Sequence, residues 1–456
     1  MKYEPTLESV SKHQVPEWFD DAKFGIFIHW GLFSVPAFAI TGIDMNENMQ
    51  KHGMEAHFKN NPYAEWYLNT MKIEGSPTQE YHNKTYGKDF SYYDFIPMFN
   101  EAIKSWNPDE MAEIFKEVGA KYVILVTRHC DGFILWPSKQ PNPNLDISIA
   151  ERDIVGELTE AVKKRGMKMG YYYCSAWDWT FNPNTIKNGP TFHGCYKNPP
   201  EYTDYVTKHW YELIDNYKPT ILWSDMGYPP GKNLHELIAY FYNKTPDGVI
   251  NNRWNHFLVD EKKVEKNHYD FQTPEYTSFK RKKKFKWEAC RGIGNSFGYN
   301  KFEKEEDHLS LEGLIRMLID IVSKNGNLLL NVGPMADGTI PEIQKNRLYE
   351  LGKWLKINGE AIYGTRPWKK PNSETIDNIE VRYTHKSNIL YVFLLDQPRN
   401  KKITILNLNI EAESSIELLG QDGYLTWNHE NNNLIIRMPN NLEESPAYVF
   451  KIQLKS

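Results

Sequence analysis

The chain has 456 residues, and its 54 Lys and Arg against 59 Asp and Glu give a net charge of −5. With 40% hydrophobic and 25% charged residues, the composition is typical of a globular protein with one large and one smaller domain. The near-neutral charge argues against a nucleic-acid binder, and no apolar run approaches the roughly 18 residues of a membrane span. The first residues lack the apolar core of a signal peptide, and the four cysteines have no CxxC spacing, so we expect a reduced, cytoplasmic protein.

Apolar, strand-like runs alternate with amphipathic segments through the first three quarters of the chain. We expect strands at residues 24–29, 122–127, 168–173, 220–223, 248–251 and 327–332. Helices are expected at 108–118, where Asn107 is an N-cap and Gly119 a stop, and at 152–164 and 311–322. Unbroken apolar strands suit a buried parallel sheet, so the repeated strand–helix units predict an α/β fold with a (β/α)8-like barrel of the TIM type, allowing for irregularity. The signature GxGxxG does not follow the first strand, which argues against a dinucleotide fold.

The pattern of the sequence changes near Pro367, from alternating strands and helices to short strands alone. Short strands broken by Asn, Gly, Pro and Asp are expected at 379–384, 389–394, 402–406, 415–420, 433–438 and 447–452. This pattern predicts a small antiparallel β-sandwich. We therefore expect a barrel domain at 1–366 and a sandwich domain at 367–456.

Carboxylates, histidines, an arginine and several tryptophans follow the predicted strands directly. They include His29-Trp30, 128–131, Tyr172 with Trp177 to Trp179, Trp223 to Asp225, Asn252 to Trp254, 271–275, and Trp287-Glu288. In a barrel, the carboxyl ends of the strands converge on one face. Aromatic rings cover the apolar side of a pyranose, and carboxylates act on a glycosidic bond. The pattern is typical of a sugar site.

Long blocks of the sequence resemble the α-L-fucosidases, glycoside hydrolase family 29. They are KFGIFIHWGLFSVPAF, WNPDEMAEIFKEVGAKYVILVTRHCDGFILWPSK, RDIVGELTEAVKKRGMKMGYYY, ILWSDMG, WEACRGIGNSFGYN and NLLLNVGPMADGTIP, in family order across about residues 10–368. The β-rich tail also matches the two-domain plan of the family. The resemblance implies a retaining exo-glycosidase that removes terminal α-L-fucose from a fucosylated glycan or small fucoside, without a metal or organic cofactor.

The resemblance also assigns catalytic roles. By this resemblance, Asp225 in LWSDMG occupies the position of the nucleophile. A retaining mechanism needs an ionised carboxylate beside the anomeric carbon and a protonatable carboxyl group opposite it. For the acid/base we favour Glu275 in DFQTPEY, because general-acid work suits a carboxyl on a partly desolvated loop. Glu288 in WEACRG is the rival, which would otherwise be a buried partner, and Glu65 in AEWY is a third candidate. The nearby charged stretch 259–266 is interpreted as an insertion.

Sugar-binding roles follow from the same resemblance. The groups expected to hold the hydroxyls and ring oxygen of fucose are His29, Trp66, His129, Tyr172, Trp223 and Arg253. Phe297 is expected in the apolar pocket for the C6 methyl group. Many relatives have two consecutive histidines where this chain has His129-Cys130. Because a thiol donates weakly, we expect one sugar hydroxyl to lose a partner there.

Other functional classes fit only parts of this sequence. A metallohydrolase would use His29, His129 and Asp131, but their spacing matches no known ligand pattern. The basic run 279–287 is interpreted as a solvated loop near the mouth of the active site, with nucleic acid or an acidic glycan as alternative partners. A catalytically weak, fucose-binding lectin is the third class. Exposed aromatic residues would equally serve a subunit interface, so a homo-oligomer stays open.

Overall fold

A computed structural model describes residues 2–255 and 267–454 of the chain. The predicted insertion at 259–266 lies outside these residues. Eight parallel strands form one sheet in the order β5-β4-β3-β2-β1-β8-β7-β6, which is the order of a barrel whose two end strands are β5 and β6. The strands are β1 (Phe24–Ile28), β2 (Tyr122–Arg128), β3 (Lys168–Cys174), β4 (Ile221–Asp225), β5 (Val249–Ile250), β6 (Phe271–Gln272), β7 (Lys286–Gly292) and β8 (Gly326–Val332). The predicted barrel fold is confirmed.

The barrel closes at a short seam. β5 and β6 have two residues each, and a parallel bridge between Asn251 and Phe271 joins them. Asp270, next to this bridge, accepts hydrogen bonds from the backbone N–H of Ile250 and the hydroxyl of Tyr242, each at 2.8 Å. A buried carboxylate with several donors replaces the ladder hydrogen bonds that two longer strands would supply.

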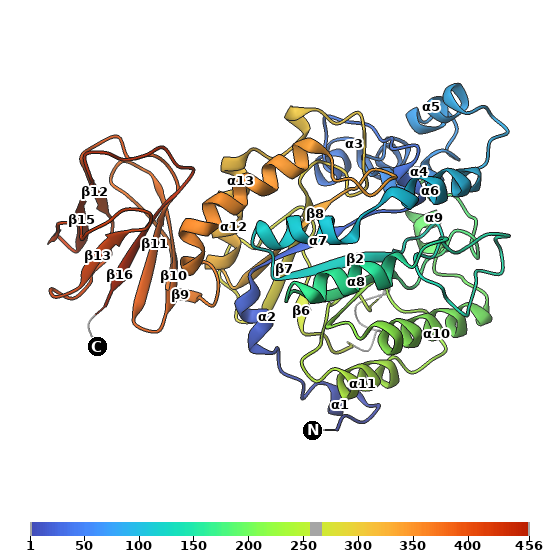
Figure 1. The fold of residues 1–456 in the computed structure, drawn as a ribbon, viewed down its shortest axis with the longest axis horizontal. Helices are drawn as coiled ribbons and strands as arrows, with labels where there is room; N and C mark the ends of the chain where they lie inside the picture. Colours follow the sequence, from blue (N-terminus) through green and yellow to red (C-terminus); the bar gives the residue numbers. More distant parts are fainter. Residues whose placement is uncertain (1, 256–266, 455–456) are drawn as a thin grey trace.

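Helices cover the outside of the barrel because each has one apolar stripe that the strands bury (Figure 1). Asn107 caps the helix that was predicted at 108–118, because its side chain accepts from the N–H groups of Asp109 and Glu110. The main outer helices are α7 (Pro108–Glu117), α8 (Ile154–Lys164), α10 (Pro200–Tyr217), α11 (Leu234–Lys244), α12 (Leu311–Ser323) and α13 (Glu342–Asn358). Among the described residues between β6 and β7 there is no helix, which is the irregularity of this barrel.

Further helices precede β1 or lie in the long connections after β1 and β3. They are α1 (Leu7–Val10), α2 (Glu17–Ala22), α3 (Met45–Lys59), α4 (Tyr67–Thr70), α5 (Pro77–Thr85), α6 (Ile96–Ala102) and α9 (Gly189–Gly194). The connection after β1 also contains the 3-10 turn η2 (Ala64–Trp66). No helix in the described parts of the chain is both long and apolar enough to cross a membrane.

The C-terminal part is a sandwich of two antiparallel sheets with its own apolar core. One sheet has the order β13-β16-β11-β10-β9 and the other β12-β15-β14. The strands are β9 (Arg366–Glu374), β10 (Glu380–Lys386), β11 (Ile389–Leu394), β12 (Lys402–Ile405), β13 (Ser415–Leu418), β14 (Trp427–Glu430), β15 (Asn433–Arg437) and β16 (Tyr448–Gln453). The predicted sandwich is confirmed, with β9 and β14 as additional strands.

The sandwich packs beside α12 and α13 of the barrel (Figure 1). Arg382 of β10 pairs with Asp320 of α12 at 2.7 Å, and the indole of Trp354 in α13 donates to the carbonyl of Ala447 at 3.2 Å. Besides these polar contacts, Tyr391, Phe393 and Val449 of the sandwich are buried in the same core cluster as the barrel, whereas the sandwich also keeps a second apolar core of its own.

The basic run 279–287 lies away from the position predicted for it. The ammonium group of Lys282 donates to the carbonyl of Trp368 at 3.0 Å, and the carbonyl of Phe285 accepts from Asn325 at 3.2 Å. Trp368 belongs to the sandwich and Asn325 directly precedes β8, so the run lies at the amino ends of the strands. The prediction of a loop at the mouth of the active site is wrong, because the helix-free chain returns from the carboxyl end of β6 to the start of β7.

Candidate active site

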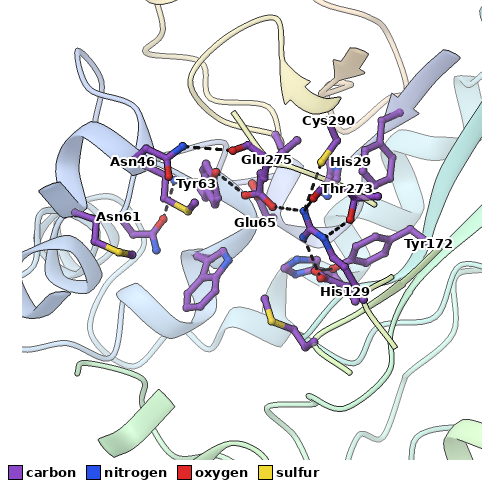
Figure 2. Close-up of a pocket in the computed structure, with 18 of the residues that line it drawn as sticks. His29, Asn46, Asn61, Tyr63, Glu65, His129, Tyr172, Thr273, Glu275 and Cys290 are labelled. Carbon is purple, nitrogen blue, oxygen red and sulfur yellow. Dashed lines mark hydrogen bonds and ion pairs between the residues drawn. The ribbon is translucent and has the colours of Figure 1, made fainter. Parts of the chain in front are cut away.

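A cavity of about 380 Å³ opens at the carboxyl ends of the barrel strands (Figure 2). Side chains from these strand ends and from the long connection after β1 line it. Every residue predicted to bind sugar lies in its wall: His29, Trp66, His129, Tyr172, Trp223, Arg253 and Phe297. Asp225, Glu275 and Glu65 also line it, whereas Glu288 does not.

Arg253 connects the two carboxylates that were predicted to be catalytic. Its Nη1 lies 3.1 Å from Oδ1 of Asp225, and its Nη2 lies 2.8 Å from Oε2 of Glu275. Thr273 orients the guanidinium by accepting from Nε at 2.9 Å. Although burial disfavours its charge, the facing carboxylates of Glu275 and Asp225 raise the pKa of Arg253 above its ordinary value. One cation therefore holds both carboxylates at the same wall of the cavity.

Two tyrosines complete the hydrogen bonds of these carboxylates. Tyr172 of β3 donates to Oδ2 of Asp225 at 2.9 Å, and Tyr63 donates to Oε1 of Glu275 at 2.8 Å. Burial, followed by the neighbouring carboxylate, raises the pKa of each phenol, so both remain donors. Asp225 ends the buried strand β4, whereas the side chain of Glu275 lies beyond β6 and is 21% exposed. The two carboxylates thus differ in their access to water.

The two predicted histidines are neutral acceptors or donors. Burial lowers the pKa of His29 to about 3. Its Nδ1 lies 2.7 Å from Oδ1 of Asn331, whose amide group donates to the carbonyl of Phe297. This arrangement assigns the proton of His29 to Nδ1 and leaves Nε2 as an acceptor. Burial also lowers the pKa of His129, and its Nδ1 has no hydrogen-bond partner among the residues described.

Aromatic rings form the apolar walls between these polar groups. Tyr172 stacks on Trp223 with ring centroids 5.5 Å apart, and the guanidinium of Arg253 lies 4.6 Å above the same indole. Phe297 contacts His29 with centroids 4.8 Å apart. Flat rings beside directed hydrogen-bonding groups suit a small, partly apolar ring such as a pyranose.

Glu288 lies inside a strand, although the sequence placed it at a strand end. It is the third residue of β7 and is fully buried. Tyr122 donates to Oε2 at 2.6 Å and the indole of Trp223 donates to Oε1 at 3.0 Å. Burial raises the pKa of Glu288 to about 7. Glu288 therefore supports Trp223 from behind and does not reach the cavity.

Glu65 is a third carboxyl group in the wall of the cavity. It lies in η2, is 2% exposed, and accepts from the backbone N–H of Gly298 at 2.8 Å. Burial raises its pKa to about 8, against the effect of that hydrogen bond. Glu65 is therefore mainly protonated at neutral pH, and its hydroxyl is a donor.

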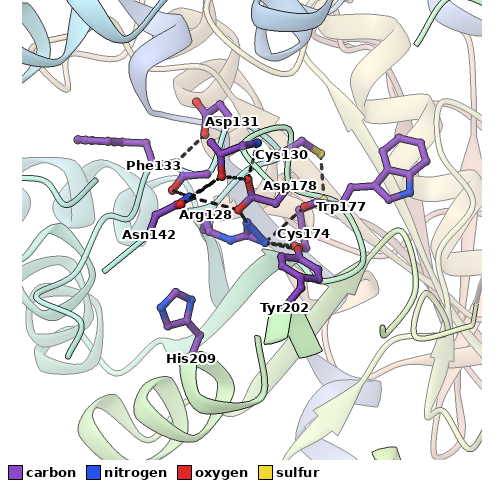
Figure 3. A network of polar contacts seen from close by, with 12 residues as sticks. Arg128, Cys130, Asp131, Phe133, Asn142, Cys174, Trp177, Asp178, Tyr202 and His209 are labelled. Carbon is purple, nitrogen blue, oxygen red and sulfur yellow. Dashed lines mark hydrogen bonds and ion pairs between the residues drawn. The ribbon is translucent and has the colours of Figure 1, made fainter. Parts of the chain in front are cut away.

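Cys130 belongs to a closed network beside the cavity (Figure 3). Its Sγ lies 2.9 Å from Sγ of Cys174, and neither thiol lines the cavity. The expected loss of a sugar contact at this thiol therefore has no support in the geometry. In the same network, Arg128 pairs with Asp178 and donates to the hydroxyl of Tyr202 at 3.0 Å. The side chains of this ion pair are completely buried.

The three residues of the alternative metallohydrolase interpretation do not line one common cavity. Asp131 accepts from Tyr92 at 2.8 Å and does not line the cavity that contains His29 and His129. Among the described residues, His13, His268 and Asp270 are the group close enough to share an ion. Asp270 already accepts from several donors at the barrel seam, so this group is explained as a structural clamp.

Several lining residues were not identified from the sequence. The polar ones are Asn46, His57, Asn61, Tyr63 and Thr273, and the apolar ones include Met45, Met49, Phe192 and Met226. Most of them lie in the long connections after β1 and β3, where no strand end marks them. Thr273, Tyr63 and Met226 had a local signal, because each is within two residues of a predicted site residue.

Comparisons with known proteins agree over nearly the whole chain. The family model described as Alpha-L-fucosidase matches residues 1–360, and that described as Alpha-L-fucosidase C-terminal domain matches residues 373–453. An α-L-fucosidase of Dictyostelium discoideum is 34% identical over 435 residues, covering 92% of this chain and 87% of the relative. The plasma α-L-fucosidase of Homo sapiens is 33% identical over 455 residues, covering 96% and 89%.

Solved structures give the same result. The crystal structure of Thermotoga maritima α-fucosidase in complex with a mechanism-based inhibitor has a TM-score of 0.88 and 44% identity, with 99% of this chain and 100% of that chain covered. The Thermotoga maritima α-L-fucosynthase in complex with α-L-Fuc-(1-2)-β-L-Fuc-N3 has a TM-score of 0.89 and 44% identity, covering 99% of each chain.

Proposed function

This chain belongs to the α-L-fucosidase family, and we propose that it hydrolyses terminal α-L-fucosides with retention of configuration at the anomeric carbon. The observation that carries the proposal is the single guanidinium of Arg253 bound to both Asp225 and Glu275 in the wall of the cavity. Retaining glycosidases place their two carboxyl groups about 5–5.5 Å apart, which is compatible with one guanidinium between them. The substrate is a fucosylated glycan or a small fucoside.

Asp225 is the proposed nucleophile. Arg253 and Tyr172 each bind one of its oxygens, which fixes the orientation of the carboxyl group in the wall of the cavity. In the first step an oxygen of Asp225 bonds to the anomeric carbon while the bond to the leaving oxygen breaks. The fucosynthase of Thermotoga maritima, in which an aspartate is replaced by glycine, supports an aspartate in this role.

Glu275 is the proposed acid/base. It gives a proton to the leaving oxygen in the first step and takes one from water in the second. Its partial exposure gives water access to the carboxyl group, and Tyr63 holds Oε1 in place. Glu288 is a weaker candidate because it does not line the cavity and its oxygens bind Tyr122 and Trp223.

The remaining groups bind the sugar in this proposal. Nε2 of His29, His129, Tyr172 and protonated Glu65 exchange hydrogen bonds with hydroxyl groups, and the rings of Trp66 and Trp223 cover the apolar face of fucose. Phe297 provides the contact for the C6 methyl group. These assignments rest on the common cavity and on the donor and acceptor character of each group.

The nucleophile is tested with 4-nitrophenyl α-L-fucoside. We expect wild-type turnover, a loss of about 10⁴-fold in Asp225→Gly, and azide rescue that yields fucosyl azide of inverted configuration. An unimpaired Asp225→Gly variant would remove Asp225 from its role. No turnover by the wild type, together with fucose binding, would favour a lectin.

The acid/base is tested with two leaving groups. Glu275→Gln should lose about 10²-fold or more in kcat/KM on methyl fucoside, where the leaving oxygen needs a proton, and less on the nitrophenyl substrate. Glu288→Gln is the matched control, and Glu65→Gln tests the third candidate. If Glu65→Gln shows this leaving-group dependence and Glu275→Gln does not, the acid/base is Glu65.

A further inference from the structure

The cavity has an inner part and a partly exposed rim that differ in character. The side chains of the inner part, including Asp225 and His129, are almost completely buried and mostly polar. At the rim, Met45, Met49, Phe192 and Met226 are only partly buried, and 37% of Met49 is exposed. Apolar side chains that face water around a binding cavity mark a surface that a ligand covers.

The part of the rim at the start of α3 lies beside the proposed acid/base. Asn46 lies between Met45 and Met49 in the first turn of α3. Its side-chain amide donates to the backbone carbonyl of Glu275 at 3.3 Å (Figure 2). Met226 directly follows Asp225. In a retaining glycosidase the acid/base contacts the leaving oxygen, so groups attached to that oxygen extend toward these residues.

Near the rim, the cavity wall also contains a buried imidazole, that of His57. His57, near the end of α3, is 3% exposed, lines the cavity, and its Nδ1 has no hydrogen-bond partner among the described residues. Burial lowers its pKa to about 4, so the imidazole is neutral at working pH. A neutral ring beside Phe58 can bind one hydroxyl group of a ligand and carries no charge to attract an acid.

We infer that Met45, Met49, Phe192 and Met226, with His57 as the polar contact, form a leaving-group site that selects aglycones with an apolar body. This inference rests on the proposed function and names the substrate class at that site: alkyl and aryl fucosides, and sugars that present an apolar face. Methionine side chains are flexible and polarisable, so the site adapts to aglycones of different shape. Lysine is absent from the described lining, and its one arginine binds the catalytic carboxylates, so an anionic aglycone finds no counter-charge that is not already engaged.

A series of n-alkyl α-L-fucosides, from methyl to hexyl, tests the inference on the full chain. The leaving alcohols have nearly equal basicity, so the chemical step stays constant while the apolar contact grows. We expect kcat/KM of the wild type to rise with chain length, by up to about fourfold for each methylene group that the rim buries. This rise in kcat/KM should come mainly from a lower KM, because the contact is made in both the ground state and the transition state.

Matched variants locate the contact. Met49→Ala and Met226→Ala should each reduce the gain from methyl to hexyl by about threefold or more. Met54→Ala is the control, because Met54 lies just beyond the kink of α3 at Gly53 and is 42% exposed but does not line the cavity. We expect the control to keep the wild-type slope.

The outcomes separate this inference from the proposed function. Turnover of every fucoside with no dependence on chain length, or an unchanged slope in both lining variants, would overturn the leaving-group site and leave the fucosidase intact. A lack of turnover on all fucosides, including the nitrophenyl substrate, would overturn both.

Discussion

Two buried arginines near the carboxyl ends of the barrel strands differ in what surrounds them. Arg128, the last residue of β2, pairs with Asp178 where both side chains are completely buried, and its Nη2 also donates to Tyr202 and to backbone carbonyls (Figure 3). Arg253, three residues after β5, divides its guanidinium between Asp225 and Glu275 beside an open cavity (Figure 2).

The difference shows how arginine–carboxylate ion pairs serve two purposes in one protein. Around Arg128 each charge is neutralised within the protein, and the network holds the ends of β2 and β3 together. Around Arg253 one cation faces two carboxylates, so the site keeps an excess of acceptors for a substrate and for a proton. A closed network therefore stabilises the fold, whereas the one that borders the cavity is available for chemistry.

The largest expected effect on stability is at Arg128. Arg128→Lys keeps the charge but loses the planar fork that reaches Asp178, Tyr202 and the backbone at once. Because these partners are buried, we expect the free energy of unfolding to fall by about 3 kcal/mol, measured by urea unfolding. A change below about 1 kcal/mol would contradict the structural role given to this network.

Arg253→Lys is the matched substitution in the open network. A lysine cannot bind both carboxylates in the geometry of the guanidinium, so we expect kcat/KM on 4-nitrophenyl α-L-fucoside to fall about 10²-fold. Water in the cavity can solvate the freed carboxylates, so stability should change by no more than about 1 kcal/mol. A loss of stability as large as that of Arg128→Lys would remove the distinction between the two networks.

Local patterns in the sequence predicted the parts of the fold that local physics determines. The strands β1, β2, β3 and β8 are buried runs of apolar residues, and α7 begins at its predicted cap Asn107. Strand β9 was missed because its two prolines and paired lysines are unlike a central strand, and it lies at the edge of its sheet. The strand β14 is polar and mostly exposed, so it has no alternating pattern to recognise.

The same limit applies to the site. His29, Asp225 and Arg253 were found because they follow strands, and the barrel brings strand ends together. Tyr63 was missed, although it binds Glu275, because the two residues are 212 positions apart and only tertiary packing joins them. Glu288 was placed at a strand end because the length of β7 cannot be read from a short apolar run.

Glu65 gives a smaller and sharper test, because it is a third carboxyl group of the open site, beside the two that form ion pairs with Arg253. Its pKa is raised to about 8 from the ordinary 4.5, mainly by burial. Above that pH a negative charge appears near Glu275 and a hydrogen-bond donor is lost, so activity should fall. The amide of Glu65→Gln remains a hydrogen-bond donor at all pH values. We therefore expect kcat/KM of this variant to be less than about tenfold below that of the wild type at pH 6, and to fall less than that of the wild type near pH 8. A profile of kcat/KM against pH measures both effects.

The same substitution has a linked effect on stability. Between pH 4.5 and about 8 the folded protein binds the Glu65 proton and the unfolded chain does not, so the free energy of unfolding falls as pH rises through this window. Glu65→Gln should remove a slope of up to about 1.4 kcal/mol per pH unit and leave the shares of the other buried carboxyl groups, which include Glu288 with a pKa raised to about 7 and Glu303 with a pKa raised to about 8. If the variant keeps both the alkaline fall in activity and the full slope in stability, Glu65 is ionised at neutral pH. The open site would then hold three carboxylates around one arginine, and the excess of acceptors that distinguishes it from the Arg128 network would be larger still.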